Sequence, residues 1–250
     1  MPPLLSAVLR SMHKQTPDVK NFFFELIEQK ERPKDAHTPS STMNFKPGQH
    51  IMIQFEKEGR KLFRPYSMTS LPEDLPKFEL CIKRYPEGSA SVYMHSLKAG
   101  DILHFLPPRG NLYVQRFDRD IAFLATGTGI TPMMAMIRQV LEMRIRHKVW
   151  LFFGNRTEED IIYKKEFADL AEANENFKPV FILSRPSDDW TGAKGYVQDF
   201  LEKFLKDFEG KDYYVCGVPQ MVVAAQEKLQ SKGVSEENIF TEGWEGGSVK

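Results

Sequence analysis

The chain has 250 residues, 41% of them apolar and 27% charged, which is the composition of an ordinary folded protein of one or two domains. Its 34 Lys and Arg residues balance its 34 Asp and Glu residues, so no overall field draws it to nucleic acid or to an anionic membrane. Any partner recognised by charge must therefore bind a local patch.

The two cysteines, Cys81 and Cys216, are too few for an iron–sulfur cluster or for a closed zinc site without nearby histidines, so no metal centre is expected. The two cysteines could form one disulfide, although thiols in a reducing cytoplasm are the expected setting. No run approaches the roughly 18 to 20 apolar residues of a membrane span, and residues 1–10 lack a basic leader before a long apolar stretch. A cytoplasmic protein without membrane insertion is expected.

Residues 1–116 are predicted to form a β-rich domain. Short alternating or β-branched runs are separated by breaks such as Pro47-Gly48, and regularly spaced short strands indicate a small barrel or sandwich. The polar stretch 29–44 is expected to be an exposed loop without fixed form. The expected strands are residues 4–10, 21–27, 50–55, 78–84 and 101–107.

After residue 116 the hydrophobic pattern changes. Residues 120–125 form a continuous apolar run, as expected of a strand buried on both faces, and a turn and a helix follow at once. Strands and helices then alternate, which predicts a parallel five-stranded sheet with helical crossovers in a second domain, residues 117–250. The expected strands are residues 120–125, 148–153, 179–184, 212–216 and 238–241, and the expected helices begin near residues 133, 158, 196 and 219.

Residues 62–70 end a segment that alternates like a strand, and Arg64, Tyr66 and Ser67 stand close together in it. Arg64 offers a planar fork of donors that fits a phosphate, Tyr66 a ring face for stacking, and Ser67 a hydroxyl for a ring nitrogen. This set suits a flat, anionic cofactor. A strand end with a surface arginine and a half-buried tyrosine is the alternative.

Gly127 and Gly129 lie between the apolar run 120–125 and an apolar helix. The glycines let the backbone turn tightly and approach a ligand, while Thr131 is predicted as the N-cap and Pro132 as the first helical residue. The helix N-terminus then favours a pyrophosphate through its free amides and partial positive charge. Because Pro132 replaces the third glycine of the dinucleotide fingerprint, a tight structural turn is the alternative.

Two further motifs end a strand or open a helix. Cys216 ends a predicted strand at the edge where open α/β sheets bind ligands, although a buried cysteine that only packs is the alternative. Gly88 precedes a short helical segment, and the amides that follow it could form an anion-binding nest with Ser91. An ordinary helix cap has the same pattern.

In their order and spacing these motifs resemble the ferredoxin-NADP reductase family of flavoprotein oxidoreductases. The resemblance covers nearly the whole chain, and it implies an N-terminal antiparallel β-barrel that binds FAD and a C-terminal α/β domain that binds NAD(P)H. The matching segments are residues 45–49, 64–67, 80–84, 88–91, 127–132, 184–186, 190–192, 195–197 and 216–221.

On the barrel, the resemblance implies that Arg64 pairs with the flavin pyrophosphate, that Tyr66 stacks on the isoalloxazine and that Ser67 lies beside its N5. Trp244 stands where family members carry an aromatic flavin shield, although this chain continues to Lys250. The implied flavin contacts are Arg64, Pro65, Tyr66, Ser67, Cys81, Ile82, Lys83, Gly88, Ser89, Ala90, Ser91 and Trp244.

On the α/β domain, the resemblance implies that residues 127–131 hold the nucleotide pyrophosphate and that Cys216 faces the nicotinamide. Ser184 and Arg185 would lie near a 2′-phosphate, so NADPH is favoured, with NADH possible. The implied nucleotide contacts are Gly127, Thr128, Gly129, Thr131, Arg156, Ser184, Arg185, Tyr196, Cys216, Gly217 and Met221. The implied catalytic residues are Ser67, Cys216 and Glu242, which would act chiefly by orientation and local polarity.

The implied activity is hydride transfer from NAD(P)H to FAD, followed by single-electron transfer to an acceptor protein such as ferredoxin or flavodoxin. A group of basic residues could receive an acidic partner of that kind, although a solvated barrel rim explains them equally. Two alternatives stay open: an NADH-dependent reductase component for an oxygenase or a cytochrome, and a flavin-binding regulatory or interaction subunit without turnover. The basic residues are Lys57, Arg60, Lys61, Lys83 and Arg84.

Overall fold

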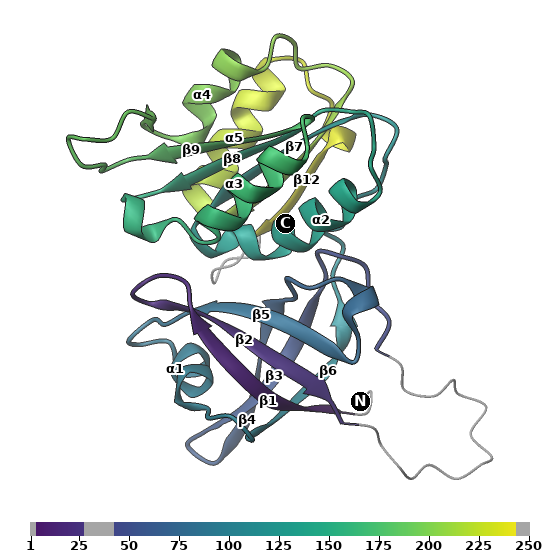
Figure 1. Ribbon diagram of the computed structural model, residues 1–250, viewed down its shortest axis with the longest axis vertical. Coiled ribbons are helices and arrows are strands. Elements are labelled where there is room, and N and C mark those ends of the chain that lie inside the picture. The colour runs from purple at the N-terminus through teal and green to yellow at the C-terminus, as the bar shows by residue number, and fades with distance from the viewer. Residues whose placement is uncertain (1–3, 28–42, 244–250) are drawn as a thin grey trace.

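Two β-sheets divide the chain between them (Figure 1). The computed structural model of the protein describes residues 4–27 and 43–243. Within these residues an antiparallel six-stranded sheet is followed by a parallel six-stranded sheet with helices on both faces, which confirms the predicted two-domain fold. Most of the predicted loop 29–44 lies outside the described residues, and so does Trp244.

The N-terminal sheet has the strand order β4-β3-β6-β1-β2-β5. Its two edge strands meet through an antiparallel bridge between Met68 and Leu80, which closes the sheet on itself. Along β1, Leu5, Ala7 and Leu9 are buried and their neighbours are not, as the period of a strand requires. The elements are β1 Leu5–Lys14, β2 Val19–Leu26, β3 His50–Lys57, β4 Arg60–Ser67, η1 Pro72–Asp74, β5 Lys77–Lys83, α1 Ser89–Ser96 and β6 Ile102–Arg109.

Aromatic side chains fill the interior of this sheet. Phe22, Phe24 and Phe78 are almost fully buried, and the rings of Phe24 and Phe78 stack with their centroids 5.4 Å apart. Helix α1 packs on the same core through Met94. The first turn of α1, which carries predicted flavin contacts, is therefore held against the barrel.

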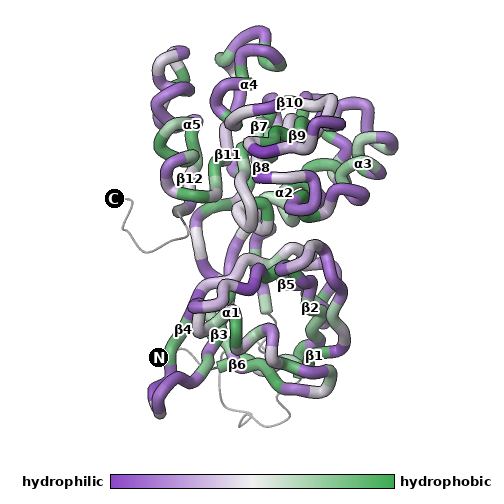
Figure 2. The backbone as a smooth tube through the Cα atoms, turned by 90° about the vertical axis from the view of Figure 1, so that its left-hand side faces the viewer, coloured by the Kyte–Doolittle hydropathy of each residue, from purple (hydrophilic) through white to green (hydrophobic). Residues whose placement is uncertain are grey.

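The C-terminal sheet is parallel throughout, in the order β10-β9-β8-β7-β11-β12. In β7, Phe123 packs into the core under α2 and α3 while Leu124 packs into the core under α4 and α5, so the helices cover opposite faces (Figure 2). The predicted count of five strands is one short, because β10 has only two residues and leaves no periodic pattern. The elements are β7 Asp120–Thr126, η2 Gly127–Gly129, α2 Ile130–Glu142, β8 Val149–Asn155, η3 Glu158–Asp160, α3 Lys164–Ala173, β9 Phe177–Leu183, β10 Ala193–Lys194, α4 Val197–Phe204, β11 Lys211–Gly217, α5 Pro219–Ser231, η4 Glu236–Asn238 and β12 Ile239–Gly243.

Helix α2 begins at Ile130, two residues before the predicted first helical residue, Pro132. The short helix η2 runs directly into it, so Gly129 and not Thr131 is the N-cap. The Oγ1 of Thr131 donates to the carbonyl of Thr128 at 2.9 Å, inside the first turn. Pro132 is tolerated there because first-turn amides have no intrahelical acceptor.

The barrel contacts the α/β domain through α2. A Cβ atom on Gly48, in the turn before β3, would lie 3.2 Å from Cγ of Met136, and the φ of +105° at this position favours glycine. The chain passes between the domains in residues 110–119, where the predicted boundary falls. Arg116 anchors this connection by donating to both carboxylate oxygens of Asp212, at 2.9 and 2.6 Å. No helix among the described residues is long and apolar enough to cross a membrane.

Candidate functional site

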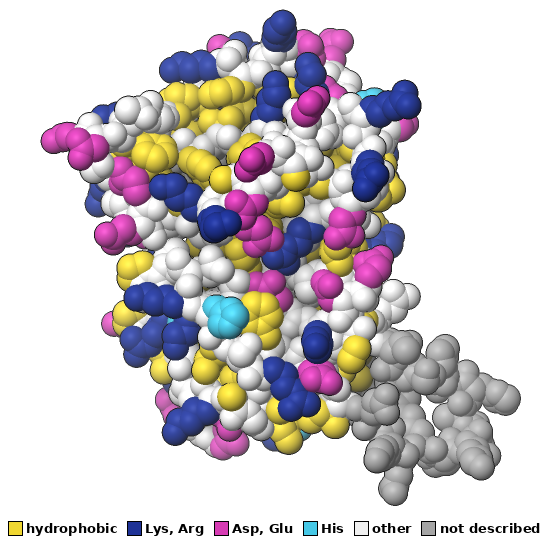
Figure 3. Space-filling view, in the orientation of Figure 1, with side chains coloured by type: hydrophobic (Ala, Val, Ile, Leu, Met, Phe, Trp, Pro, Cys, Tyr) yellow, Lys and Arg dark blue, Asp and Glu magenta, His cyan; other side chains and the backbone are white. Residues whose placement is uncertain are grey.

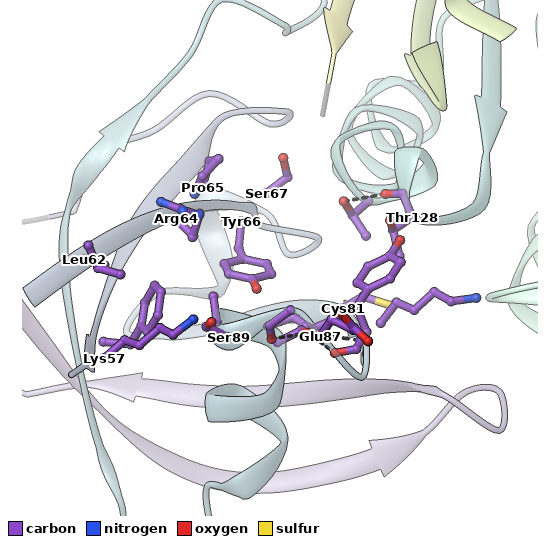
Figure 4. A pocket seen from close by; sticks show the side chains of 18 residues that line it. Lys57, Leu62, Arg64, Pro65, Tyr66, Ser67, Cys81, Glu87, Ser89 and Thr128 are labelled. Carbon is purple, nitrogen blue, oxygen red and sulfur yellow. Dashed lines mark hydrogen bonds between the residues drawn. The ribbon is translucent and has the colours of Figure 1, made fainter. Parts of the chain in front are cut away.

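A cleft of about 520 Å³ opens between the barrel and the start of α2 (Figure 4). Every predicted flavin contact that lies within the described residues lines it. Thr128 and Thr131 of the predicted nucleotide loop line it from the other domain. The structure thus brings residues of both predicted sets into one crevice, while their individual roles in binding stay predictions.

Strand pairing explains why distant motifs meet in this cleft. Strand β4 ends at Ser67, and the next residue, Met68, bridges to Leu80 of β5, so Ser67 and Cys81 come from adjacent strands. Strand β5 then leads into the turn before α1, which adds residues 88–91. The two edge strands and the short helix α1, together with Phe55 and Lys57 at the end of β3, therefore build the barrel side of the cleft.

The hydroxyl of Ser67 is buried, with 3% of the residue exposed, and it has no hydrogen-bond partner among the described residues. A buried hydroxyl without a hydrogen-bond partner lowers the stability of the folded protein by about 1–3 kcal/mol. Such a group indicates a site where a ligand or a water molecule supplies the missing hydrogen bond. A nitrogen or carbonyl oxygen of a flavin ring would supply the partner. The residues present therefore fit a flavin.

Tyr66 and Arg64 present a ring and a cation to the same cleft (Figure 4). Burial raises the pKa of Tyr66 to about 12, so its ring is neutral at physiological pH and suited to stacking. Arg64 is exposed, and its Nη1 donates to the carbonyl of Phe63 at 2.8 Å. Its outward position leaves the guanidinium accessible to a phosphate.

In the turn before α1, the hydroxyl of Ser91 hydrogen-bonds to the backbone, and its predicted contact with an anion stays a prediction. Its Oγ accepts a hydrogen bond from the amide of Tyr85 at 3.0 Å and donates one to the carbonyl of Gly88 at 2.9 Å. A Cβ atom on Gly88 would lie 2.8 Å from that Oγ, so a larger residue there would require the Ser91 hydroxyl to shift. The hydroxyl of Ser91 thus shapes the turn, and the first-turn amides of α1, which have no helical acceptor, are the groups left for an anion.

The predicted pyrophosphate loop fits tightly against the end of β11. A Cβ atom on Gly129 would overlap the carbonyl of Cys216, and one on Gly217 would overlap Oγ1 of Thr126. Gly127, with φ of +53°, has open space beside it. Because β7 and β11 are adjacent parallel strands, both loops lie at the carboxyl edge of the sheet.

A second group of predicted nucleotide contacts lies further along this edge. The amide of Arg185 donates to the carbonyl of Arg156 at 2.8 Å, which joins the loops after β9 and β8. Ser184, Arg185 and Arg156 are all exposed, so a phosphate could reach their side chains. Tyr196 is 63% exposed at the N-cap of α4, whereas Met221 is buried at 7%.

The thiol of Cys216 does not line the cleft. Its side chain is fully buried in the core beneath α2, and its carbonyl borders Gly129. Its place facing a nicotinamide stays a prediction. Cys81 does line the cleft, but burial raises the pKa of its thiol, so it is a neutral packing group and not a thiolate.

Glu242, near the end of β12, contacts His50, a residue that belongs to none of the predicted cofactor motifs. Its Oε1 lies 3.2 Å from Nδ1 of His50, the first residue of β3. His50 also lies opposite Ser67 in the β3–β4 pair. In the sequence, the feature that could have pointed to His50 is its position directly after the predicted barrel turn 45–49.

Comparisons with known proteins agree with this arrangement. Residues 6–113 match the family described as oxidoreductase FAD-binding domain, and residues 123–227 match the oxidoreductase NAD-binding domain. Over 198 residues the chain is 36% identical to NADH-cytochrome b5 reductase 1 of Dictyostelium discoideum, with 78% of this chain and 69% of that protein covered. It is 32% identical over 211 residues to ferredoxin–NADP reductase B of Sorangium cellulosum, with 79% and 84% covered.

Solved structures share the fold. The CS-b5R domains of human Ncb5or, in an NAD⁺ form, superpose with a TM-score of 0.82 at 27% identity, covering 96% of this chain and 69% of that chain. A ferredoxin NADP⁺ reductase of Neisseria gonorrhoeae with bound FAD and NADP gives 0.80 at 22% identity, covering 97% and 99%.

A β-barrel and a parallel α/β domain that share one cleft define a two-domain oxidoreductase that uses a flavin and a nicotinamide nucleotide. The chain belongs to the ferredoxin-NADP reductase family, as its motifs indicated. FAD and a nicotinamide cofactor are therefore its cofactors, and it is an NAD(P)H-dependent flavoprotein reductase.

Proposed function

We propose that this protein transfers electrons from NADPH through FAD to a separate one-electron carrier such as ferredoxin or flavodoxin. The observation that carries the proposal is one cleft lined both by residues 64–67 and by Thr128 and Thr131 of the predicted nucleotide loop. When bound, the flavin accepts a hydride from the reduced nicotinamide and passes electrons on singly.

The chain's own residues would act by holding two rings face to face. Arg64 would bind a phosphate, Tyr66 would cover one ring face, and Ser67 would donate to or accept from a ring atom. The first-turn amides of α2 would face the anionic nucleotide. Reacting atoms held about 3–3.5 Å apart account for roughly 7–11 kcal/mol of a barrier, so placement is the main contribution of the protein.

NADPH is the proposed nucleotide. Three exposed side chains, those of Arg156, Ser184 and Arg185, follow neighbouring strands at the carboxyl edge of the sheet. Two guanidinium groups and a hydroxyl offer the donors that a 2′-phosphate accepts, whereas a ribose hydroxyl is usually held by an acidic residue.

The proposed acceptor is an acidic carrier protein. Lys57 and Lys83 line the cleft, Lys83 in an ion pair with Asp18 at 2.8 Å, and Arg60 and Lys61 are exposed in the neighbouring β3–β4 hairpin. A cationic rim of this kind steers an anionic partner towards the flavin edge. A reducing cytoplasm is the proposed setting, because Cys81 and Cys216 are both buried and are not joined in a disulfide.

A second candidate function is NADH-dependent reduction of a cytochrome or of an oxygenase. The observation that favours it is the 36% identity to a protein named NADH-cytochrome b5 reductase. A flavin-binding regulatory subunit without turnover is the candidate from another class.

Anaerobic titration of the FAD-loaded protein with NADPH and NADH in turn separates these candidates. Rapid bleaching by NADPH, followed by recolouring with oxidised ferredoxin or flavodoxin, is the expected result. Preferential bleaching by NADH with recolouring by cytochrome b5 would favour the second candidate. If neither nucleotide bleaches the flavin, the result would favour the third candidate, a flavin-binding regulatory subunit without turnover.

A further inference from the structure

The guanidinium group of Arg138, near the end of α2, joins the two domains. We propose that Arg138 is a positioning residue for hydride transfer: through Glu79 it holds α2, which begins at the nucleotide loop, against β5, which lines the flavin cleft. The inference rests on the proposed function, since a positioning role in hydride transfer requires that transfer to occur.

Arg138 binds groups on both sides of the domain boundary. Towards the barrel, its Nη1 donates to Oε2 of Glu79 at 3.2 Å and to the carbonyl of Thr69 at 2.5 Å. Towards α3, its Nε and Nη2 donate to Oε1 of Glu166 at 3.0 and 2.7 Å. Burial opposes its charge, but attraction from Glu166 and Glu79 outweighs burial and raises the pKa of Arg138, so the group stays cationic.

Glu79 is held from a second direction. The hydroxyl of Tyr163, just before α3, donates to the other carboxylate oxygen of Glu79 at 3.0 Å, and Glu79 is only 6% exposed. The amide of Tyr163 donates to Oε1 of Gln15 at 3.3 Å, which adds another contact with the barrel. A buried carboxylate is strongly unfavourable without its partners, so these contacts define one orientation of the two domains.

The same two elements form opposite walls of the flavin cleft. Glu79 and Cys81 are two residues apart on β5, so they share a face of the strand, and Cys81 lines the cleft. Thr131 and Arg138 are seven residues apart on α2, so they share a face of the helix, and Thr131 lines the cleft. Movement at the Arg138–Glu79 contact therefore changes the separation of the cleft walls.

A restraint of this kind has a mechanical reason. Domains joined by one chain segment move relative to each other unless their interface prevents it. Hydride transfer depends steeply on the separation of the reacting atoms, and a misplacement of about 1 Å can cost roughly 100-fold in rate. Arg138 touches no cofactor in this scheme and acts only through α2 and β5.

The test compares Arg138→Met with the wild type as full-length, FAD-loaded proteins. In stopped-flow experiments with NADPH, or with NADH if that nucleotide reduces the wild type faster, the limiting rate of flavin reduction should fall about 10- to 100-fold. Reoxidation of the reduced protein by ferricyanide requires no nucleotide and should not change. A merely destabilised protein would lose flavin and slow both half-reactions together.

Glu79→Gln provides the partner variant, since it keeps the shape of the side chain and removes its charge; it also serves if Arg138→Met folds poorly. Lys228→Met is the matched control, because Lys228 pairs with Glu202 at 2.6 Å within the α/β domain alone, and it should reduce at the wild-type rate. Small-angle X-ray scattering of the flavin-free proteins gives a readout apart from activity: the two interface variants should have a larger radius of gyration than the wild type.

Wild-type reduction rates and wild-type scattering in both interface variants would overturn the inference and leave the proposed function intact. Equal slowing of both half-reactions would overturn it as well. A wild-type protein whose flavin neither nucleotide bleaches would overturn the proposed function, and the positioning role with it.

Discussion

Nδ1 of His50 lies 3.2 Å from Oε1 of Glu242, so the first residue of β3 contacts the end of β12 across the domain boundary. Both side chains are largely buried. Ser67 lies opposite His50 in the β3–β4 pair, so the hydroxyl predicted to face the flavin is a neighbour of this contact. The predicted catalytic residue Glu242 therefore owes its position to the barrel as well as to its own domain.

Substitution of Gly110 should disturb this contact. Gly110 has φ of +113°, and an added Cβ atom would lie 3.0 Å from Nδ1 of His50 and 3.7 Å from Oε1 of Glu242. We expect Gly110→Ala to lower the free energy of unfolding by about 1–3 kcal/mol more than Gly100→Ala does, measured by urea titration, because only at Gly110 does the new Cβ atom crowd a neighbour. Gly100→Ala is the control, because Gly100 has φ of +97° and open space around it. Equal losses in both variants would contradict a specific role of the His50 site.

Ser67→Ala should slow hydride transfer without lowering the stability of the flavin-free protein. Because the buried Oγ has no partner among the described residues, its removal should leave the flavin-free protein equally stable or more stable. With FAD bound, hydride transfer should slow while nucleotide affinity is unchanged. Ser70→Ala is the contrast: its Oγ accepts the amide of Glu79 at 3.1 Å, so its loss should cost about 1 kcal/mol without any cofactor. A large loss of flavin-free stability in Ser67→Ala would refute this account.

His95 should make stability depend on pH. Burial lowers the pKa of His95, whose Nε2 donates to the carbonyl of Ile82 at 2.9 Å. The unfolded chain then binds the proton at a higher pH than the folded chain, so stability is fully present above about pH 6.5 and declines as the pH falls below it. Urea unfolding at about pH 7.5 and about pH 5.5 should show a smaller decline in His95→Gln than in the wild type. Identical declines would rule out this contribution.

Gly129→Ala should push the predicted nucleotide loop away from the end of β11. Its φ is −60°, so the backbone itself accepts a side chain, but the new Cβ atom would overlap the carbonyl of Cys216. Overpacking of this kind costs about 1–3 kcal/mol, and we expect that loss in thermal or urea unfolding together with weaker nucleotide binding. Gly127→Ala is the converse case: the new Cβ atom would have open space, but the φ of +53° is unfavourable for alanine. This variant therefore tests backbone strain alone. Unimpaired nucleotide affinity in Gly129→Ala would show that the close fit is unnecessary.

Arg185→Ala should distinguish the two nucleotides. If the exposed guanidinium binds a 2′-phosphate, its removal should raise the KM for NADPH about 10-fold or more and leave the KM for NADH unchanged. Arg146→Ala removes the same charge from the loop before β8, at the opposite edge of the sheet, and should change neither value. An equal rise for both nucleotides would remove the basis for preferring NADPH.

Much of the fold was predictable because each element satisfies a local pattern. Residues 120–125 are apolar throughout, and β7 is buried on both faces as that run predicted. The barrel side of the cleft was predictable because Arg64, Tyr66 and Ser67 carry complementary chemistry within four consecutive residues. Thr131 shows the limit of local patterns: a threonine before a proline looks like an N-cap, but η2 runs into α2 and places it inside the helix.

The contacts between the domains were not predictable in this way. In the sequence, Arg138 looks like an exposed charge on an amphipathic helix. Its partner Glu79 lies in a strand 59 residues earlier in the chain. His50 and Glu242 likewise belong to different sheets. On the face drawn in Figure 3, acidic and basic side chains are interspersed, so charge alone singles out no pair there.

The sequence by itself determined the order of the elements, the two-domain fold and the cofactor motifs at residues 64–67, 88–91 and 127–132, because burial period, turn chemistry and such motifs act over a few neighbouring residues. Only the tertiary structure decided that Arg138 meets Glu79, that Glu242 meets His50, and that the thiol of Cys216 points into a core. Those relationships depend on how two packed domains dock, and hydrogen bonds and ion pairs form only when that docking brings their atoms within about 3 Å.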